Sequence, residues 1–424
     1  MLDLMIRNVV LPDERTGQDV GIKEGRIVDI RPALDIQATE EIDGGGYLLS
    51  PPFVDSHFHM DSTLSYGRPR VNASGTLLEG IQLWGELKPE LTHADIKDRA
   101  HRLCRWAMAK GNLAIRTHVD ICDPSLMAVE ALLEVREDLR PFMDIQLVAF
   151  PQDGFYRDPN AEALLLKALD KGVDVVGGIP HFERTMADGA RSIQRLCEIA
   201  AERGLLVDMH CDESDDPLSR HVETLACETQ RLGLHGRVTG SHLTSMHSMD
   251  NYYVSKLMAL MQEAEMHAVA NPLINITLQG RHDTYPKRRG MTRVKELLAS
   301  GINVAFGHDC VMDPWYSLGT HDMLEVAFMG LHVGQMTGQA DMHAIFDAIT
   351  VNGARALRLD GYGIDVGAHA DMVLLQARSR IEALRVRPAR LAVIRRGRVI
   401  ATTPRVATTV TAFGEPSTVD FLHT

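Results

Sequence analysis

Between about residue 50 and residue 310 the chain repeats one pattern: a short apolar run, a loop and a helical segment. The runs that we interpret as strands are 52–59, 113–119, 144–152, 173–181, 205–210, 237–242, 267–273 and 302–309. Nearly continuous apolar strands that alternate with amphipathic helices are typical of a parallel sheet covered by helices. Eight such units predict an α/β fold in which the sheet closes into a (β/α)₈, TIM-like barrel.

The helix after the first strand shows how its ends are marked in the sequence. Thr92 to Asp95 resembles a capping box, apolar residues follow at helical spacing, and Gly111 stands where the helix should end. Further helices are expected at 124–139, 161–171, 190–203, 217–232 and 292–300. These segments lie between the predicted strands, as the barrel requires.

The two ends of the chain have a different pattern. Apolar runs at 4–10 and 20–30 flank turn residues near the start, and similar runs recur at 370–375 and 391–400. We predict that residues 1–50 and 360–424 form one small, discontinuous, β-sandwich-like domain. Residues 51–359 would then form the barrel.

Composition narrows the class of protein. Hydrophobic residues make up 45% of the chain and charged residues 24%, as in ordinary globular proteins. The start lacks a secretory signal pattern and no segment is apolar enough to span a membrane, so we expect a cytoplasmic protein without a membrane partner. A net charge of −13 argues against nucleic-acid binding. The six cysteines are scattered and suggest neither disulfides nor a thiolate zinc site.

Polar residues gather at the ends of the predicted strands, where the active site of such a barrel lies. His57 and His59 end the first strand and point the same way, because side chains alternate along a strand. Other strand ends carry Gln152, His210 with Glu213 three residues on, His242 and Asp309. Buried polar groups are costly unless they are paired or bind something, and imidazole is a common metal ligand. The pattern therefore favours a metal site at this rim.

Three more histidines lie in or near strands two, four and seven: His118, His181 and His267. Each could be a ligand, a partner of a ligand or a core histidine bonded to the backbone. Their spacing does not choose among these roles.

Several longer motifs resemble those of bacterial cytosine deaminases, a family of the amidohydrolase superfamily. They are 75–81, 148–152, 208–213, 240–242, 283–290 and 306–309, and the similarity covers nearly the whole chain, both ends included. The resemblance implies one divalent metal ion per subunit, Fe²⁺ or Zn²⁺, and a homo-oligomer. It assigns the metal ligands His57, His59, His210 and Asp309, the proton-transfer residues Glu213 and His242, and the substrate contacts Gln152, Leu77, Cys310 and Trp315.

The implied reaction is the hydrolysis of free cytosine or 5-methylcytosine to uracil or thymine and ammonia. A bound metal can lower the pKa of water from about 15.7 to ~7. His242, assisted by Asp309, would take the water's proton, and hydroxide would attack C4 of the ring. Glu213 would protonate N3, so that negative charge does not build up on the ring.

Two departures from related patterns sharpen this prediction. Two-metal members of the superfamily use a lysine at the end of strand four, but residues 173–182 contain none, so a single metal is expected. The cytosine deaminase motif usually has a second aspartate after the strand-eight ligand, where this chain has Cys310. That change is either neutral drift or a gain of apolar room beside ring position five, which would admit the methyl group of 5-methylcytosine.

Other functions remain open at this point. The chain could deaminate a related ring, isoguanine or creatinine. A cyclic-amide hydrolase of the dihydroorotase or hydantoinase kind could share the barrel and the His-x-His start, although the missing lysine and Glu213 count against it. A non-catalytic metal scaffold would leave Glu213, His242 and Gln152 without a purpose. The chain also lacks the H-x-E and P-C-x-x-C pattern of the zinc deaminases that act on nucleic acids.

Overall fold

Eight parallel strands form the central sheet of the protein, which is a computed structural model that describes residues 1–412 and 414–422. The strands are β6 (Phe53–Phe58), β7 (Asn112–Asp120), β8 (Asp144–Phe150), β9 (Val175–Gly178), β10 (Leu206–Cys211), β11 (Val238–His242), β12 (His267–Ala270) and β13 (Asn303–Phe306). They pair in chain order from β6 to β13. The α/β barrel predicted from the sequence is therefore confirmed.

The first and last strands meet through the residues that follow them. The Asp309 N–H donates to the His57 carbonyl at 2.8 Å, and the His59 N–H donates to the Asp309 carbonyl at 2.9 Å. These two bonds close the barrel at the place where three of the predicted metal ligands lie.

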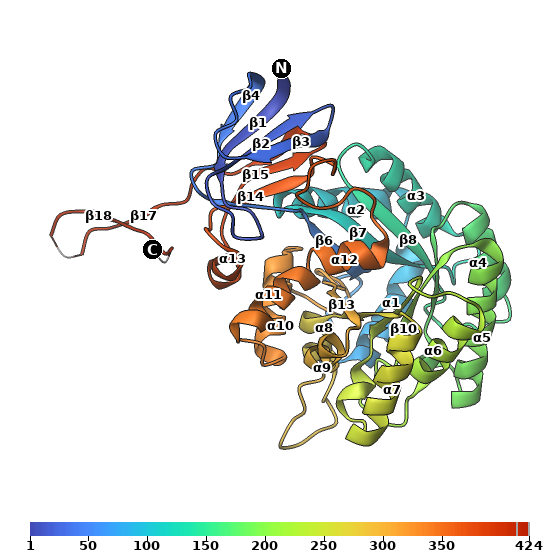
Figure 1. The fold of residues 1–424 in the computed structure, drawn as a ribbon. Coiled ribbons are helices and arrows are strands. Elements are labelled where there is room, and N and C mark those ends of the chain that lie inside the picture. The colour runs from blue at the N-terminus through green and yellow to red at the C-terminus, as the bar shows by residue number, and fades with distance from the viewer. Residues whose placement is uncertain (413, 423–424) are drawn as a thin grey trace.

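Helices surround the sheet, as Figure 1 shows. Those between the strands include α2 (His93–Ala109), α3 (Met127–Leu139), α4 (Ala161–Asp170), α5 (Met186–Arg203), α6 (His221–Arg231), α7 (Asn251–Glu263) and α9 (Val294–Ala299). The last strand, β13, is followed by α10 (Met323–Val333), α11 (Gln339–Ala348) and α12 (Val351–Leu357). At the start of α2 the Thr92 side chain accepts the Asp95 N–H, as the sequence predicted. Among the described residues, no helix combines the length and the apolar character needed to cross a bilayer.

The structure corrects two strand ends. The seventh strand was expected to reach residue 273, but β12 ends at Ala270 and α8 (Pro272–Leu278) follows. Pro272 has no N–H to give a strand and suits the first turn of a helix, where that donor is not needed. The fourth strand was expected to reach residue 181, but η2 (Pro180–Phe182) turns the chain there.

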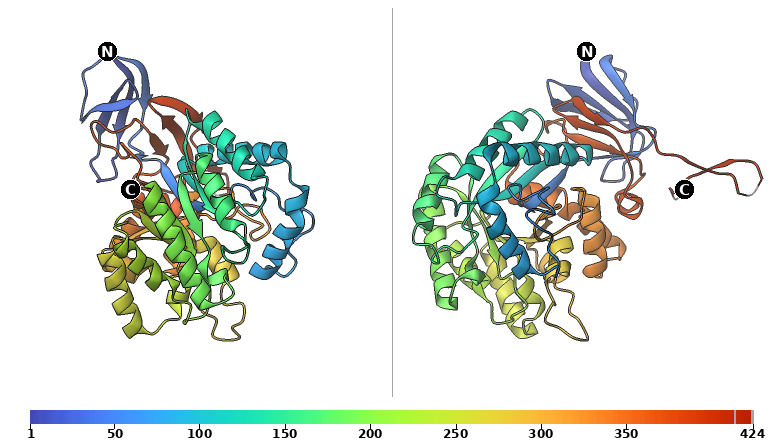
Figure 2. Two further views of the ribbon diagram at one scale, coloured as in Figure 1. Left: turned by 90° about the vertical axis from the view of Figure 1, so that its right-hand side faces the viewer. Right: turned by 180° about the vertical axis from the view of Figure 1, so that it is seen from behind.

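Strands from both ends of the chain form two further sheets beside the barrel. One has the order β3 (Arg26–Arg31), β2 (Gln18–Lys23), β1 (Leu2–Val9) and β4 (Ala38–Asp43); the other has the order β16 (Arg398–Thr402), β15 (Arg390–Arg395), β14 (Met372–Leu375) and β5 (Leu48–Ser50). Side chains from both sheets share one apolar core, which includes Leu4, Ile22 and Ile394. The exact domain boundaries stay a prediction. The hairpin of β17 (Thr408–Val410) and β18 (Ser417–Val419) projects from this part of the molecule (Figures 1 and 2).

Candidate active site

A cavity opens at the carboxyl ends of the barrel strands. It contains about 630 Å³ of space not filled by protein atoms, part of which is open solvent at its mouth. Nine residues singled out from the sequence line it: His59, Leu77, Gln152, His210, Glu213, His242, Asp309, Cys310 and Trp315. His181 also lines the cavity, and His57 is fully buried beside it. The strand-end residues therefore meet in one place, although their roles stay predictions.

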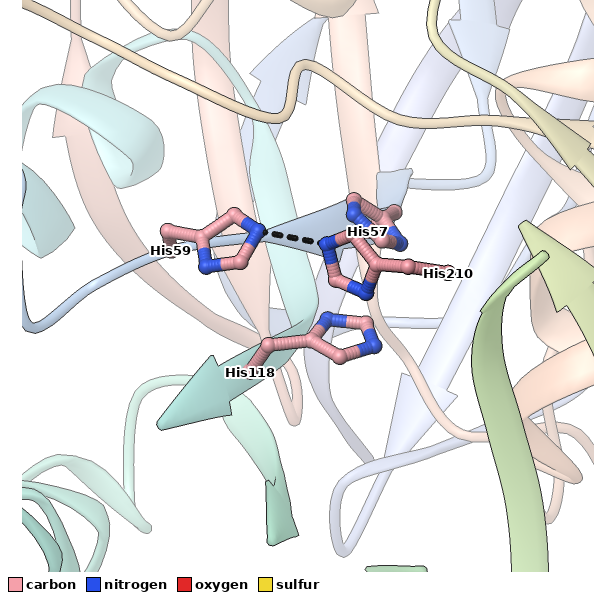
Figure 3. A group of neighbouring side chains, drawn as sticks. All are labelled: His57, His59, His118 and His210. Atoms are coloured by element: carbon pink, nitrogen blue, oxygen red, sulfur yellow. Dashed lines mark hydrogen bonds between the residues drawn. The ribbon is translucent and has the colours of Figure 1, made fainter. Parts of the chain in front are cut away.

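The imidazoles of four histidines come together at the base of the cavity (Figure 3). His57, His59, His118 and His210 each offer a ring nitrogen, and these nitrogens all lie within 4.8 Å of one another. The Nε2 atoms of His59 and His210 are 2.9 Å apart. Burial, followed by the neighbouring imidazoles, lowers the pKa of His57 and His210 well below the ordinary value. The rings of His57 and His210 are thus neutral, which is the form that binds metals.

Asp309 completes an arrangement that fits a divalent metal ion. Its Oδ1 atom lies 3.5 Å from His59 Nε2 and 3.7 Å from His57 Nε2. Ligand atoms about 2.0–2.2 Å from a common zinc ion lie roughly 3–3.5 Å apart, close to these distances. Among the described residues, neither ring nitrogen of His57 has a hydrogen-bond partner. Buried nitrogens without partners next to a buried carboxylate are what a cation would satisfy.

The structure also places the other two histidines whose roles the sequence left undecided. His118 lies against the cluster, with its ring centroid 4.1 Å from that of His57, and its Nε2 is 3.6 Å from Asp208 Oδ1. Asp208 is itself held by the buried guanidinium of Arg116 at 3.0 Å. His267 begins β12 instead of ending it, and faces the carbonyl of Gly236 at the opposite end of the barrel. His267 is therefore outside the cavity.

Glu213 is the second carboxylate in the cavity. Burial raises its pKa to about 8, so at neutral pH it keeps a proton that it can donate. Its Oε1 lies 3.5 Å from His242 Nδ1, while His242 Nε2 lies 3.7 Å from Asp309 Oδ2. His242 therefore stands between the two carboxylates.

Backbone conformation aims these side chains. His242, the last residue of β11, and Asp309, which follows β13 after Gly307 and His308, have φ angles of 71° and 69°. This left-handed region is uncommon for residues other than glycine and costs energy, so the surrounding structure must hold it. Asp212, next to Glu213, is also left-handed, with a φ of 52°. Its carboxylate is held in place because it accepts hydrogen bonds from the Ser219 hydroxyl at 2.6 Å and the Val222 N–H at 2.8 Å.

One wall of the cavity is a helix that the sequence did not reveal, α1 (Leu77–Leu87). Its Trp84 donates through Nε1 to Asp120 Oδ2 at 2.8 Å, and Lys88 donates to the same oxygen at 3.0 Å. Gly80 faces Trp315 so closely that a Cβ atom there would lie 2.4 Å from the indole Cδ1. These contacts fix α1 against Trp315. Only Leu77 and Trp315 within this group were predicted, because the others depend on contacts that the pattern does not show.

Comparison with known proteins gives consistent matches. Residues 40–410 match the model of the amidohydrolase family. A crystal structure of 5-methylcytosine deaminase from Klebsiella pneumoniae with 5-fluorocytosine is 41% identical, with a TM-score of 0.93, and the match covers 96% of this chain and 100% of that one. A second structure of that enzyme, with phosphonocytosine, is 42% identical with a TM-score of 0.91, covering 94% and 98% of the two chains.

Two curated relatives act on other rings. N-isopropylammelide isopropyl amidohydrolase from Pseudomonas sp. (strain ADP) is 32% identical over 410 residues, which cover 94% of this chain and 97% of that protein. Pterin deaminase from Rhizobium rhizogenes is 30% identical over 391 residues, covering 90% and 87%. The names of these similar proteins thus point to different substrates.

Proposed function

Because the chain belongs to the amidohydrolase family, we propose that this metal-dependent hydrolase of C–N bonds deaminates a free cytosine-type base. The products would be uracil or thymine and ammonia. The observation that carries the proposal is the meeting of a metal-type cluster with a protonated, buried Glu213 in one small cavity. The identity of 41–42% to two structures of a 5-methylcytosine deaminase supports it.

The donor set fits one divalent ion. His57, His59, His210 and Asp309 would hold it, and both Fe²⁺ and Zn²⁺ accept such nitrogen and oxygen ligands. When bound, the ion would supply a water molecule of lowered pKa, and therefore hydroxide at neutral pH.

The side chains of the cavity would supply the remaining chemistry. Glu213 would donate its proton to N3 of the ring as C4 is attacked, because its raised pKa keeps it protonated at neutral pH. Asp309 and His242, whose Oδ2 and Nε2 atoms lie 3.7 Å apart, would handle the proton that the attacking water loses. Gln152 would bind the amide edge of the pyrimidine, and Leu77 and Trp315 would pack against the ring. Ammonia then leaves from C4.

We propose that 5-methylcytosine is preferred over cytosine. Cys310 lines the cavity, is 3% exposed, and its Sγ lies 3.5 Å from Asp309 Oδ1. Burial raises the pKa of this thiol well above its ordinary value, so the wall beside the ring is neutral. A neutral wall accepts a methyl group that a carboxylate would repel, because a charged oxygen loses hydration when it is covered.

We propose a homo-oligomer that acts in the cytoplasm on free bases and not on nucleic acid. A net charge of −13 opposes binding to phosphate backbones.

The test is an ammonia-release assay of the zinc-loaded and iron-loaded protein with cytosine, 5-methylcytosine, isoguanine and creatinine. We expect ammonia from the two cytosines with no opening of the ring. Glu213→Gln should keep its metal and lose turnover. Ring opening without ammonia, or ammonia from isoguanine or creatinine alone, would contradict the proposal.

A further inference from the structure

Two buried asparagines contact His242 and have no part in the mechanism above. Asn275, on α8, places its Nδ2 3.0 Å from His242 Nδ1. Asn271 places its Nδ2 3.3 Å from Nδ1 and 3.4 Å from Nε2 of His242, so this contact does not distinguish the two ring nitrogens. Both asparagines are 0% exposed and His242 is 1% exposed, so water does not compete for these contacts.

The orientation of the Asn275 amide is fixed by its other end. Its Oδ1 accepts the backbone N–H of Asn271 at 3.1 Å. A backbone N–H can only donate, so the oxygen of the amide must face it and the NH₂ group must face His242. The NH₂ group can also only donate, so His242 Nδ1 must be the acceptor.

This contact determines where the hydrogen of His242 resides. A neutral imidazole has one N–H, and a ring whose Nδ1 accepts a hydrogen bond carries it on Nε2. A hydrogen on Nδ1 would face the NH₂ group of Asn275, donor against donor. Nε2 is the nitrogen on the side of Asp309, 3.7 Å from Oδ2.

We propose that Asn275 is a positioning residue that holds His242 as the Nε2–H tautomer, with its N–H directed toward the reacting water. His242 then donates a hydrogen bond, and an Asp309 oxygen accepts the water's proton while the O–H electron pair stays on the water oxygen. This differs from the sequence-based expectation, in which His242 takes the proton. The catalytic part of the inference rests on the proposed deamination, whereas the tautomer does not.

The experiment is a long-range ¹H–¹⁵N correlation spectrum of the zinc-loaded enzyme labelled with ¹⁵N-histidine. His242 is assigned by the signals that disappear in His242→Gln. We expect wild-type His242 to show the Nε2–H pattern. Asn275→Asp should move the hydrogen to Nδ1, because a carboxylate at that place accepts where the amide donated. An Nδ1–H ring in the wild type, or an unchanged tautomer in Asn275→Asp, would overturn the inference.

Kinetics provide a second readout with a matched control. Asn275→Asp and Asn275→Leu should each lower kcat about tenfold or more while KM stays within about threefold, because the substrate does not contact residue 275. Asn303 makes the same kind of contact to His267 at 3.2 Å at the other end of the barrel, so Asn303→Asp should change neither constant beyond about threefold. Equal losses in both asparagine variants would mark a structural effect and refute the positioning role. The spectra need no substrate, so failure of the deamination assay leaves the tautomer test valid.

Discussion

Replacing Cys310 by aspartate tests the substrate preference at the one residue that departs from the cytosine deaminase motif. The thiol is buried in the cavity wall, next to Asp309 and close in sequence to the buried Asp313. A carboxylate at this position would add a charged or protonated polar group where ring position five is expected to lie. The volume changes little, so the variant alters polarity more than shape.

The size of the effect follows from two contributions. Burying the extra methyl of 5-methylcytosine against the thiol is worth ~0.8 kcal/mol, or about fourfold in kcat/KM. Covering a carboxylate with that methyl costs about 1–3 kcal/mol of lost hydration. Together these contributions predict that Cys310→Asp lowers the ratio of kcat/KM for 5-methylcytosine to that for cytosine by about 20- to 600-fold.

The assay measures both kcat/KM values by ammonia release for the wild type, Cys310→Asp and Cys310→Ser. Serine is the matched control because it keeps the small size and adds no charge, and it should change the ratio by less than about tenfold. Metal content and melting temperature are checked for each variant. A wild type that prefers cytosine, together with a ratio that Cys310→Asp leaves unchanged, would refute the reasoning.

The rate should fall as the pH rises past about 8, because Glu213 must keep its proton to donate it and its raised pKa is about 8. A profile of kcat/KM against pH measures this fall. Glu213→Gln should abolish the fall and lower the rate by about 10²–10⁴-fold. Lys88→Met should raise KM up to about fivefold with kcat little changed, since the end of α1 loses its ion pair with Asp120. Lys97→Met, on α2 and outside the cavity, should leave KM unchanged in the same steady-state assay. Arg116→Met should lower the free energy of unfolding in urea by about 3–5 kcal/mol, because it leaves a buried carboxylate unpaired, and a loss below 1 kcal/mol would contradict this.

The barrel could be predicted because its strands are buried on both faces and read as apolar runs in chain order. The predicted strand ends were wrong where an apolar run fits both a strand and a helix. The predicted seventh strand was extended past Asn271 to residue 273, although the proline at position 272 signals that a helix begins. The helix α1 was missed for a different reason: it lies between the first strand and α2, where the barrel pattern demands one helix and the chain provides two.

The residues of the candidate site also fall into those that the sequence could predict and those that it could not. Residues at strand ends could be predicted to meet because parallel strands bring their carboxyl ends to one rim. Residues that act by contacting another residue of the site could not be predicted. Asn275 is 33 positions from His242, and Lys88 is 32 positions from Asp120. Neither pair has a spacing that helical or strand geometry makes meaningful, so only the folded chain reveals the contact.

The two carboxylates of the cavity show why environment, and not residue type, decides their roles. Both are buried, and burial raises the pKa of each. Glu213 has an imidazole as its neighbour and no metal-ligand geometry, so it stays protonated and serves as an acid. Asp309 faces the Nε2 atoms of His57 and His59 at the place where a cation fits, and a bound cation favours its ionised form. The same ion that supplies hydroxide would thus also keep Asp309 able to accept a proton, so acid and base remain separate within one cavity.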